Sequence, residues 1–253
     1  MKIVRFSHNN QITYGLVEGD IVKAIKGTPY SKIVVTGERF SIDKVEILPP
    51  CKPQKIICLG LNYSDHAEEV GLDIPKYPVI FLKPQTTIVG HGEEVVLAKM
   101  SRRNDFEAEL AFVIKKKARN VPEEKAKEYI LGYTCANDVT ARSLQPKDGQ
   151  WTISKSFDTY CPIGPCIANG IDINNLKIEM LVNGEVKQSS NTGNLIFKPE
   201  FLVSYLSKVM TLMPGDIILT GTPSGIGKVE PGDVMTVRIE GIGDLVNQCV
   251  AEK

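Results

Sequence analysis

The sequence lacks the features that mark several classes of protein. Its 253 residues contain one tryptophan and three histidines, and its 30 lysines and arginines are balanced by 30 aspartates and glutamates. A formal net charge of zero argues against a nucleic-acid-binding protein, which carries a basic excess or stripe. It also argues against a polybasic membrane anchor. We therefore expect no nucleic-acid partner and no membrane partner.

Long apolar runs are also missing. No uncharged apolar segment approaches the roughly 18 residues that cross a bilayer, and the opening residues MKIVRFSHNN are too polar for a signal peptide. The six cysteines form no CxxC pair, and the shortage of histidines argues further against a Cys/His zinc site. We expect reduced, mostly buried thiols in a cytoplasmic protein.

What is present is the composition of a globular protein, with 42% hydrophobic and 24% charged residues. Short candidate strands separated by turns fill the first fifty residues. Pro49-Pro50, with Pro53 following, marks a boundary because proline interrupts both sheets and helices. We therefore predict a small β-rich N-terminal subdomain over residues 1–52 and a main domain over residues 53–253.

The main domain contains many candidate strands and few helices. Helices are predicted over 64–70, over 122–132 and over about 199–210, the last two because a proline occupies the first turn. Asn183-Gly184 between two strand-like runs predicts a hairpin. The strands do not alternate regularly with helices, which favours a mainly β or α+β fold over a doubly wound α/β sheet.

The most informative segment runs from residue 105 to 114. As one strand over 106–114, it would place Glu107 and Glu109 on the same face, roughly 6–7 Å apart at their roots, because side chains alternate along a strand. A solvated strand face would explain such a pair. However, five apolar residues follow, as in a buried strand, and two buried like charges need a positive partner. On these grounds a solvated face and a metal site are about equally supported.

A third carboxylate favours the metal site. Asp138 ends an apolar strand predicted over 133–138, and strand ends often carry sites. If the next turn is helical, Asp138, Arg142 and Gln145 lie at i, i+4 and i+7 on one face; Asp138 could also cap that helix. Three carboxylates suit a hard ion such as Mg²⁺ or Mn²⁺. The predicted metal ligands are therefore Glu107, Glu109 and Asp138.

Three further candidates are less specific when taken singly. His66 and Glu69 lie at i and i+3 on the short helix, where a carboxylate can orient an imidazole, although an exposed surface pair is the alternative. Lys155 lies in a weakly charged stretch, and its alternative is a solvated loop lysine. The glycine-rich loop over 221–227 lacks P-loop spacing, but its backbone N–H groups could receive a carboxylate.

Together these motifs resemble the fumarylacetoacetate hydrolase family. The resemblance spans about residues 55 to 240 and rests on segments in a fixed order: GLNY at 60–63 followed by His66 and Glu69, FLKP at 81–84, DFEAEL at 105–110, NDVTAR at 137–142, KSFD at 155–158 and LTGTP at 219–223. The resemblance implies a mixed β-sandwich roll that forms a homodimer. It also implies a divalent ion, Mg²⁺ or Mn²⁺, on the three predicted ligands.

The resemblance implies roles for other residues as well. His66 and Glu69 would activate water from a segment that acts as a lid, and Lys155 would stabilise developing negative charge. The family's substrates are 2,4-dioxo acids or 2-hydroxydienoates, so we expect a small anionic 2-oxo acid as ligand. Its carboxylate or oxo group would be contacted by Arg142, Gln145 and Thr222.

The expected reaction is metal-dependent hydrolysis of the C–C bond of an acylpyruvate, from which a pyruvate enolate leaves. The alternative is an isomerase, tautomerase or decarboxylase acting on 2-hydroxyhepta-2,4-diene-1,7-dioate or oxaloacetate, because one enolate chemistry supports all these reactions. Retention of His66 and Glu69 favours hydrolysis. A non-catalytic β-rich binding protein is an alternative of a different class.

Overall fold

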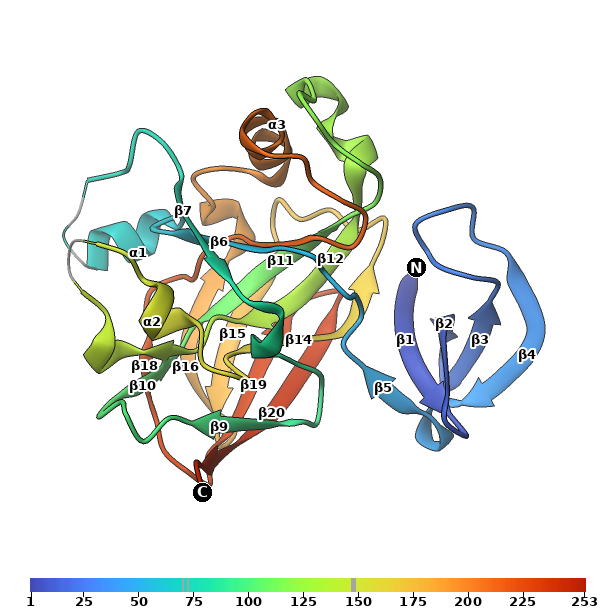
Figure 1. Ribbon diagram of the computed structural model, residues 1–253, viewed down its shortest axis with the longest axis horizontal. Coiled ribbons are helices and arrows are strands. Elements are labelled where there is room, and N and C mark those ends of the chain that lie inside the picture. Colours follow the sequence, from blue (N-terminus) through green and yellow to red (C-terminus); the bar gives the residue numbers. More distant parts are fainter. Residues whose placement is uncertain (70, 72, 147–148) are drawn as a thin grey trace.

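A computed structural model describes residues 1–69, 71, 73–146 and 149–253. Strands far outnumber helices, which confirms the predicted mainly β fold. Figure 1 shows the N-terminal strands as a small lobe beside a larger body of packed sheets. No helix in these described ranges is long and apolar enough to span a bilayer.

The N-terminal lobe contains five short strands separated by turns. Asn9, Asn10 and Gly19 in these turns have positive φ, which these residue types tolerate. β1 pairs with both β2 and β5, and its first residues also pair with β14 of the main body through Ile3 and Ile167. The strands are β1 (Lys2–His8), β2 (Gln11–Glu18), β3 (Ile21–Ile25), β4 (Val35–Ser41) and β5 (Glu46–Leu48).

That pairing extends the N-terminal strands into the largest sheet of the main body. The order is β4-β3-β2-β1-β14-β12-β11-β17-β6-β7, and the pairing of β17 with β6 is parallel, so the sheet is mixed. β11 and β12 are buried along their whole length. The strands are β6 (Ile56–Gly60), β7 (Val79–Lys83), β11 (Ala108–Ile114), β12 (Ile130–Asn137), β14 (Cys161–Ala168) and β17 (Ile217–Leu219), and β8 (Ile88–Val89) pairs with β14.

A second sheet packs against this one, which completes the sandwich. Its order is β16-β15-β19-β20-β9. Leu110 and Phe112 of the first sheet share one core with Met180, Val237 and Leu245 of the second. The hairpin predicted at Asn183-Gly184 joins β15 to β16 and is confirmed. The strands are β9 (Glu94–Leu97), β15 (Lys177–Val182), β16 (Glu185–Asn191), β19 (Val234–Ile239) and β20 (Gly243–Ala251).

A third, small sheet and three helices surround the sandwich. The sheet has the order β13-β10-β18, with β10 (Asn104–Phe106), β13 (Thr140–Ala141) and β18 (Gly227–Val229). The helices are α1 (Ser64–Glu69), α2 (Thr152–Lys155) and α3 (Pro199–Val209). α1 and α3 confirm two predicted helices, although the predicted end of the first, residue 70, lies outside the described residues. Turns of 3₁₀ type are η1 (Ile42–Lys44), η2 (Gln85–Thr87), η3 (Glu123–Tyr129), η4 (Arg142–Leu144) and η5 (Thr192–Asn194).

The helix predicted over 122–132 is found as a shorter helix of 3₁₀ type, Glu123–Tyr129. The segment forms η3, and the chain is already in β12 from Ile130 onward. A proline followed by two glutamates does favour a helical start. However, β12 pairs with β11 on one side and with β14 on the other, so its residues are committed to the middle of the sheet. Tertiary pairing has therefore overridden the local signal.

Two predictions beside the candidate site also need correction. The strand predicted over 106–114 is interrupted at Glu107: β10 pairs with β13 and β18, whereas β11 pairs with β12 and β17. The chain thus changes sheets at Glu107. The helical turn predicted after Asp138 is replaced by β13 and η4. Arg142 and Gln145 consequently meet through one 3₁₀ turn.

Candidate active site

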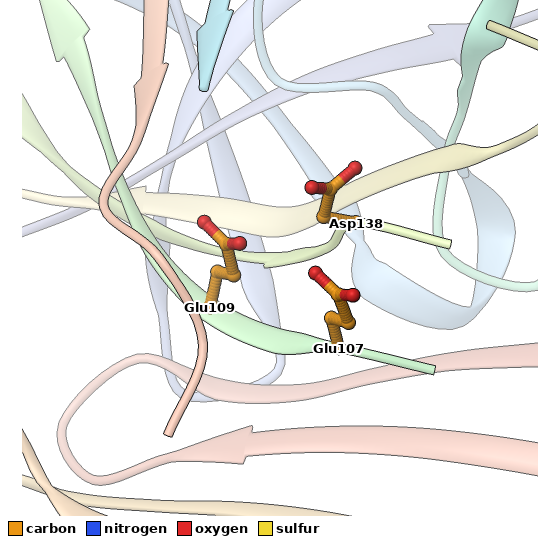
Figure 2. A group of neighbouring side chains, drawn as sticks. All are labelled: Glu107, Glu109 and Asp138. Atoms are coloured by element: carbon orange, nitrogen blue, oxygen red, sulfur yellow. The ribbon is translucent and has the colours of Figure 1, made fainter. Parts of the chain in front are cut away.

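The three predicted metal ligands come together where the chain changes sheets. Glu109 lies in β11, Glu107 directly precedes that strand, and Asp138 directly follows the neighbouring strand β12 (Figure 2). One carboxylate oxygen of each residue lies within 4.8 Å of the others, and all three side chains are buried. The β11–β12 register, with Ala108 opposite Asn137, explains this convergence. A solvated face for the glutamate pair is thereby excluded.

Buried cationic side chains neutralise part of this cluster. Lys155 Nζ donates to Glu107 Oε2 at 2.8 Å and to Asp138 Oδ2 at 2.6 Å. Arg142 donates to Glu107 Oε1. Burial raises the pKa of Glu107, but the two cations outweigh it and lower that pKa to about 2. Burial lowers the pKa of Lys155, but the two carboxylates raise it overall. Lys155 is therefore a buried, charged lysine and not the solvated loop lysine of the alternative.

A second buried lysine was missed by the sequence reasoning. Lys83, at the end of β7, donates to Asp138 Oδ1 and to the carbonyl of Val139 at 3.2 Å. Its side chain is fully buried. The sequence signal that could have identified Lys83 is its place between an apolar strand and Pro84, inside one of the motifs that carried the resemblance. No local pattern distinguishes such a lysine from an exposed one at a strand end.

Glu109 differs from the other two carboxylates. Its Oε2 accepts a hydrogen bond from the backbone N–H of Gly221 at 2.7 Å, but its Oε1 is buried with no partner among the described residues. Burial, together with the charges of Asp138 and Glu107, raises the pKa of Glu109 well above its usual range. A cation at this point would satisfy the orphan oxygen. An all-oxygen set of this kind suits Mg²⁺ or Mn²⁺, so the residues present fit such an ion.

The predicted His–Glu pair lies on α1. His66 Nδ1 is 3.0 Å from Glu69 Oε2, and Glu69 Oε1 accepts from the backbone N–H of Gly225 at 3.0 Å. Gly221 and Gly225 lie in the same loop, so this loop joins the pair to the carboxylate cluster through Glu109. His66 is only 8% exposed, whereas the Glu69 side chain is 40% exposed, so the imidazole is buried and its carboxylate partner faces solvent.

The position of α1 is fixed by a further set of contacts. Asp65 Oδ2 accepts hydrogen bonds from the Ser190 hydroxyl and, at 3.4 Å, from the Asn194 amide. Asn62, just before the helix, donates to the carbonyls of Thr220 at 2.7 Å and Phe197 at 3.1 Å. The segment that carries His66 is therefore seated on β16, η5 and the strand end that precedes the glycine-rich loop.

The predicted substrate-binding residues fall into two groups. Arg142 donates to Gln145 Oε1, to Glu107 and, at 2.9 Å, to Asp105 Oδ2. Asp105 is fully buried and holds the guanidinium in place; the sequence reasoning gave it no role. Thr222 lies apart from this group, on the loop that contacts Glu109.

Gln188 begins the segment 188–194, which the sequence suggested, without placing it, for the pocket of the substrate's distal group. Its Nε2 donates to Thr222 Oγ1 and to the Pro223 carbonyl, both at 2.9 Å, and its Oε1 accepts from the backbone N–H of Ala108 at 2.9 Å. Gln188 thus joins β16, the start of β11 and the glycine-rich loop. Its partners lie 34 to 80 residues away in sequence, so only the folded chain identifies them.

Comparison with known proteins identifies the family. A model described as fumarylacetoacetate (FAA) hydrolase C-terminal matches residues 55–250. The chain belongs to the fumarylacetoacetate hydrolase family. The resemblance inferred from the ordered motifs is confirmed. A second model, described as Rv2993c-like, N-terminal, matches residues 1–50.

Relatives within the family carry the names of different enzymes. Oxaloacetate tautomerase Fahd2a, mitochondrial, from Rattus norvegicus is 42% identical and shares 81% of this chain and 69% of its own length. The structure of 5-carboxymethyl-2-hydroxymuconate delta-isomerase from Mycobacterium smegmatis has a TM-score of 0.94 at 40% identity, with both chains fully covered. Maleylpyruvate hydrolase from Sphingobium sp. SYK-6, in complex with manganese (II) ion and pyruvate, has a TM-score of 0.83 at 29% identity, again with full coverage of both chains. The family's members are thus enzymes of several reaction classes.

Proposed function

We propose that this protein is a divalent-metal-dependent hydrolase that cleaves the C3–C4 bond of an acylpyruvate-type 2,4-dioxo acid. The observation that carries the proposal is the pair of buried His66 and exposed Glu69, joined through one loop to the carboxylate cluster. Hydrolysis needs a base that takes a proton from water, and an imidazole oriented by a carboxylate is such a base. The manganese and pyruvate named with the maleylpyruvate hydrolase structure support the choice.

Glu107, Glu109 and Asp138 would hold the Mg²⁺ or Mn²⁺ ion. When bound, the ion supplies Lewis-acid polarisation of the substrate's 2-oxo acid group. The protein's own contribution begins with Glu69, which accepts from His66 Nδ1 and leaves Nε2 as the basic nitrogen that takes the proton from water. The water oxygen would bond to C4, the C3–C4 bond would break with its electron pair on the leaving pyruvate enolate, and the proton taken up by Nε2 would return to C3 to give pyruvate.

Lys155 is arranged to stabilise that enolate. Two of its three N–H groups donate to Glu107 and Asp138, and the third has no acceptor among the residues the structure describes. This free N–H can donate to an oxygen that becomes negative as the bond breaks. Because Lys155 remains charged, it stabilises the enolate without giving up its proton.

Arg142, Gln145 and Thr222 complete the proposed site as substrate-binding groups. Gln145 uses its amide oxygen to accept from Arg142, and its amide N–H₂, which has no acceptor within the described ranges, can donate to a substrate carboxylate. The hydroxyl oxygen of Thr222 accepts from Gln188, which leaves the hydroxyl proton free to donate. Donors of this kind select a small anionic 2-oxo acid.

Pyruvate release from acetylpyruvate tests the hydrolase proposal. Wild-type protein with Mn²⁺ should release pyruvate, measured by a coupled dehydrogenase assay, and His66→Asn should be slower by at least about 100-fold, as for loss of a general base. His91→Asn is the matched control, because His91 accepts from the Val246 N–H outside the proposed site. Absence of pyruvate from every acylpyruvate tried would reject hydrolysis.

Tautomerisation of oxaloacetate is the second candidate, favoured by the name of the 42% identical rat relative. In this reaction His66 would exchange a proton with C3, and no water would attack. The absorbance of the oxaloacetate enol should then decay faster with the wild-type protein than with His66→Asn, without release of pyruvate. Pyruvate from oxaloacetate would instead indicate decarboxylation.

We also propose that the chain is a cytoplasmic homodimer. The dimer is implied by the family, and the cytoplasmic location is supported by the six free, buried cysteines, which suit a reducing compartment. Light scattering of the purified protein should give twice the chain mass of 27.9 kDa. A monomeric mass would reject the dimer, and recovery of the protein in an organelle or exported fraction would reject the location.

A further inference from the structure

A cavity lies away from the carboxylate cluster, where the N-terminal lobe meets the main body. It has a volume of about 390 Å³, within the range of small-molecule sites. Arg5 of β1 lines it from the lobe, and Gln85 and Ile88 line it from the main body. The segment that connects the lobe to the main body forms the rest of the cavity wall, with Pro49 and residues 51–54.

Arg5 brings a buried positive charge to this cavity. The residue is only 7% exposed, yet the one acceptor found for its guanidinium in the described chain is the Pro49 carbonyl, at 3.4 Å from Nη1. A guanidinium has five N–H donors. No carboxylate in the described chain lies within ion-pair distance of Arg5. A buried charge without a partner is costly. The remaining N–H groups of Arg5 can therefore bind an anion from outside the chain.

The polar neighbours of Arg5 do not neutralise it. Tyr14 lies opposite Arg5 in the β1–β2 register, and its ring contacts that of Tyr30, with centroids 6.5 Å apart. Burial raises the pKa of Tyr14, of Tyr30 and of the Cys51 thiol. All three groups are therefore uncharged at neutral pH.

Asp216, a buried carboxylate beside Cys51 of the cavity lining, is occupied by other partners. Asp216 pairs with Lys55 Nζ at 2.7 Å and accepts from the backbone N–H groups of Gln54 and Lys55 at 3.1 and 2.9 Å. It also accepts from the Met213 N–H at 2.7 Å. Lys52, which lines the cavity, adds a second positive charge. The lining thus contains two cations and no acidic residue.

We propose that this cavity binds a small carboxylate with an apolar body, held by Arg5. A guanidinium presents two parallel N–H groups that match the two oxygens of a carboxylate. Pro49, Pro53 and Ile88 offer apolar surface to the rest of the molecule. The site shares no residue with the proposed active site, so it does not depend on which reaction the protein catalyses.

Binding of 4-fluorobenzoate, followed by ¹⁹F NMR line broadening, tests the proposal on the full-length protein. The active site could also bind a carboxylate, so two variants are compared. Arg142→Met removes the active-site guanidinium. It should not change the 4-fluorobenzoate concentration at which the ¹⁹F line broadening saturates. Arg5→Met keeps the apolar stem and should weaken binding at least tenfold. The reverse pattern, or equal binding by both variants, would overturn the proposal.

A rim variant keeps the test decisive if Arg5→Met fails to fold. Lys52→Glu reverses an exposed charge at the cavity and should weaken 4-fluorobenzoate binding severalfold, whereas Lys44→Glu, at a lysine outside the lining, should not. Unchanged binding by Lys52→Glu would count against the site. Inorganic phosphate is the competing anion: if it displaces the probe at lower concentration than benzoate does, the preference for an apolar carboxylate is wrong.

Discussion

Replacing Glu109 by glutamine should have opposite effects with and without metal. One of its oxygens lies within 4.8 Å of oxygens of Glu107 and Asp138. At an effective dielectric of about 20, each such pair of like charges costs about 3.5 kcal/mol. The nearby Lys155 offsets roughly one of the two pairs, which leaves at most about 3.5 kcal/mol. Because its pKa is raised well above the usual range, Glu109 takes up a proton in the metal-free protein instead of bearing the full repulsion, and holding that proton at neutral pH also costs at most about 3.5 kcal/mol relative to an ordinary glutamate. Glutamine keeps the acceptor for Gly221 and can donate to the neighbouring carboxylates.

We therefore expect Glu109→Gln to stabilise the metal-free protein by about 2 kcal/mol, or about 4–8 °C in Tm. With Mn²⁺ at 100 times its Kd, the wild type should gain about 2.7 kcal/mol and the variant should gain nothing, so the order of the two Tm values reverses. Thermal unfolding in chelator and in Mn²⁺ measures both effects. The matched control is Glu179→Gln, a buried glutamate paired with Lys177 at 2.7 Å, which should show no metal dependence. A lower Tm for Glu109→Gln in chelator, or equal Mn²⁺ shifts in both proteins, would refute the reasoning.

Three further substitutions, one of them with a comparison variant, test individual contacts. Lys83→Met leaves the Asp138 carboxylate short of a buried partner and should cost about 3–5 kcal/mol in urea unfolding, unless added Mn²⁺ restores part of it. Gly132→Ala would place a Cβ 2.5 Å from a backbone carbonyl of β14 and should lower stability by about 1–3 kcal/mol, whereas Gly184→Ala, with open space but positive φ, should cost about 1 kcal/mol. Gln188→Leu frees the Thr222 hydroxyl and should raise KM more than it lowers kcat in steady-state kinetics, and an unchanged KM would contradict its positioning role.

The parts of the fold that were predicted correctly depend on local signals. α3 begins with a proline in its first turn and buries Leu202, Val203 and Leu206 at helical spacing. The β15–β16 hairpin follows from Asn183-Gly184, whose positive φ angles suit those residue types. The helix expected over 122–132 had an equally good start signal. It forms as a 3₁₀ helix that ends at Tyr129, because β12 pairs from Ile130 onward with strands that the local sequence does not reveal.

In the candidate site, too, features set by local sequence were predicted and features set by distant contacts were not. The spacing of Glu107 and Glu109 predicted two converging carboxylates, but it did not predict that the strand breaks at Glu107 and enters another sheet. The contacts of Lys83 and Gln188 were not predicted because their partners lie 55 and up to 80 residues away. Asp105 stood inside a recognised motif, yet only the folded chain places it against Arg142.

Calorimetric titration of Mn²⁺ into the metal-free protein tests the central claim most directly. The wild type should bind one ion per chain, and Glu107→Gln, Glu109→Gln and Asp138→Asn should each lose most of that affinity. Glu128→Gln, at a surface glutamate paired with Lys116, serves as the control and should bind as the wild type does. Unchanged Mn²⁺ affinity in all three site variants would contradict the assignment of this cluster as the metal site.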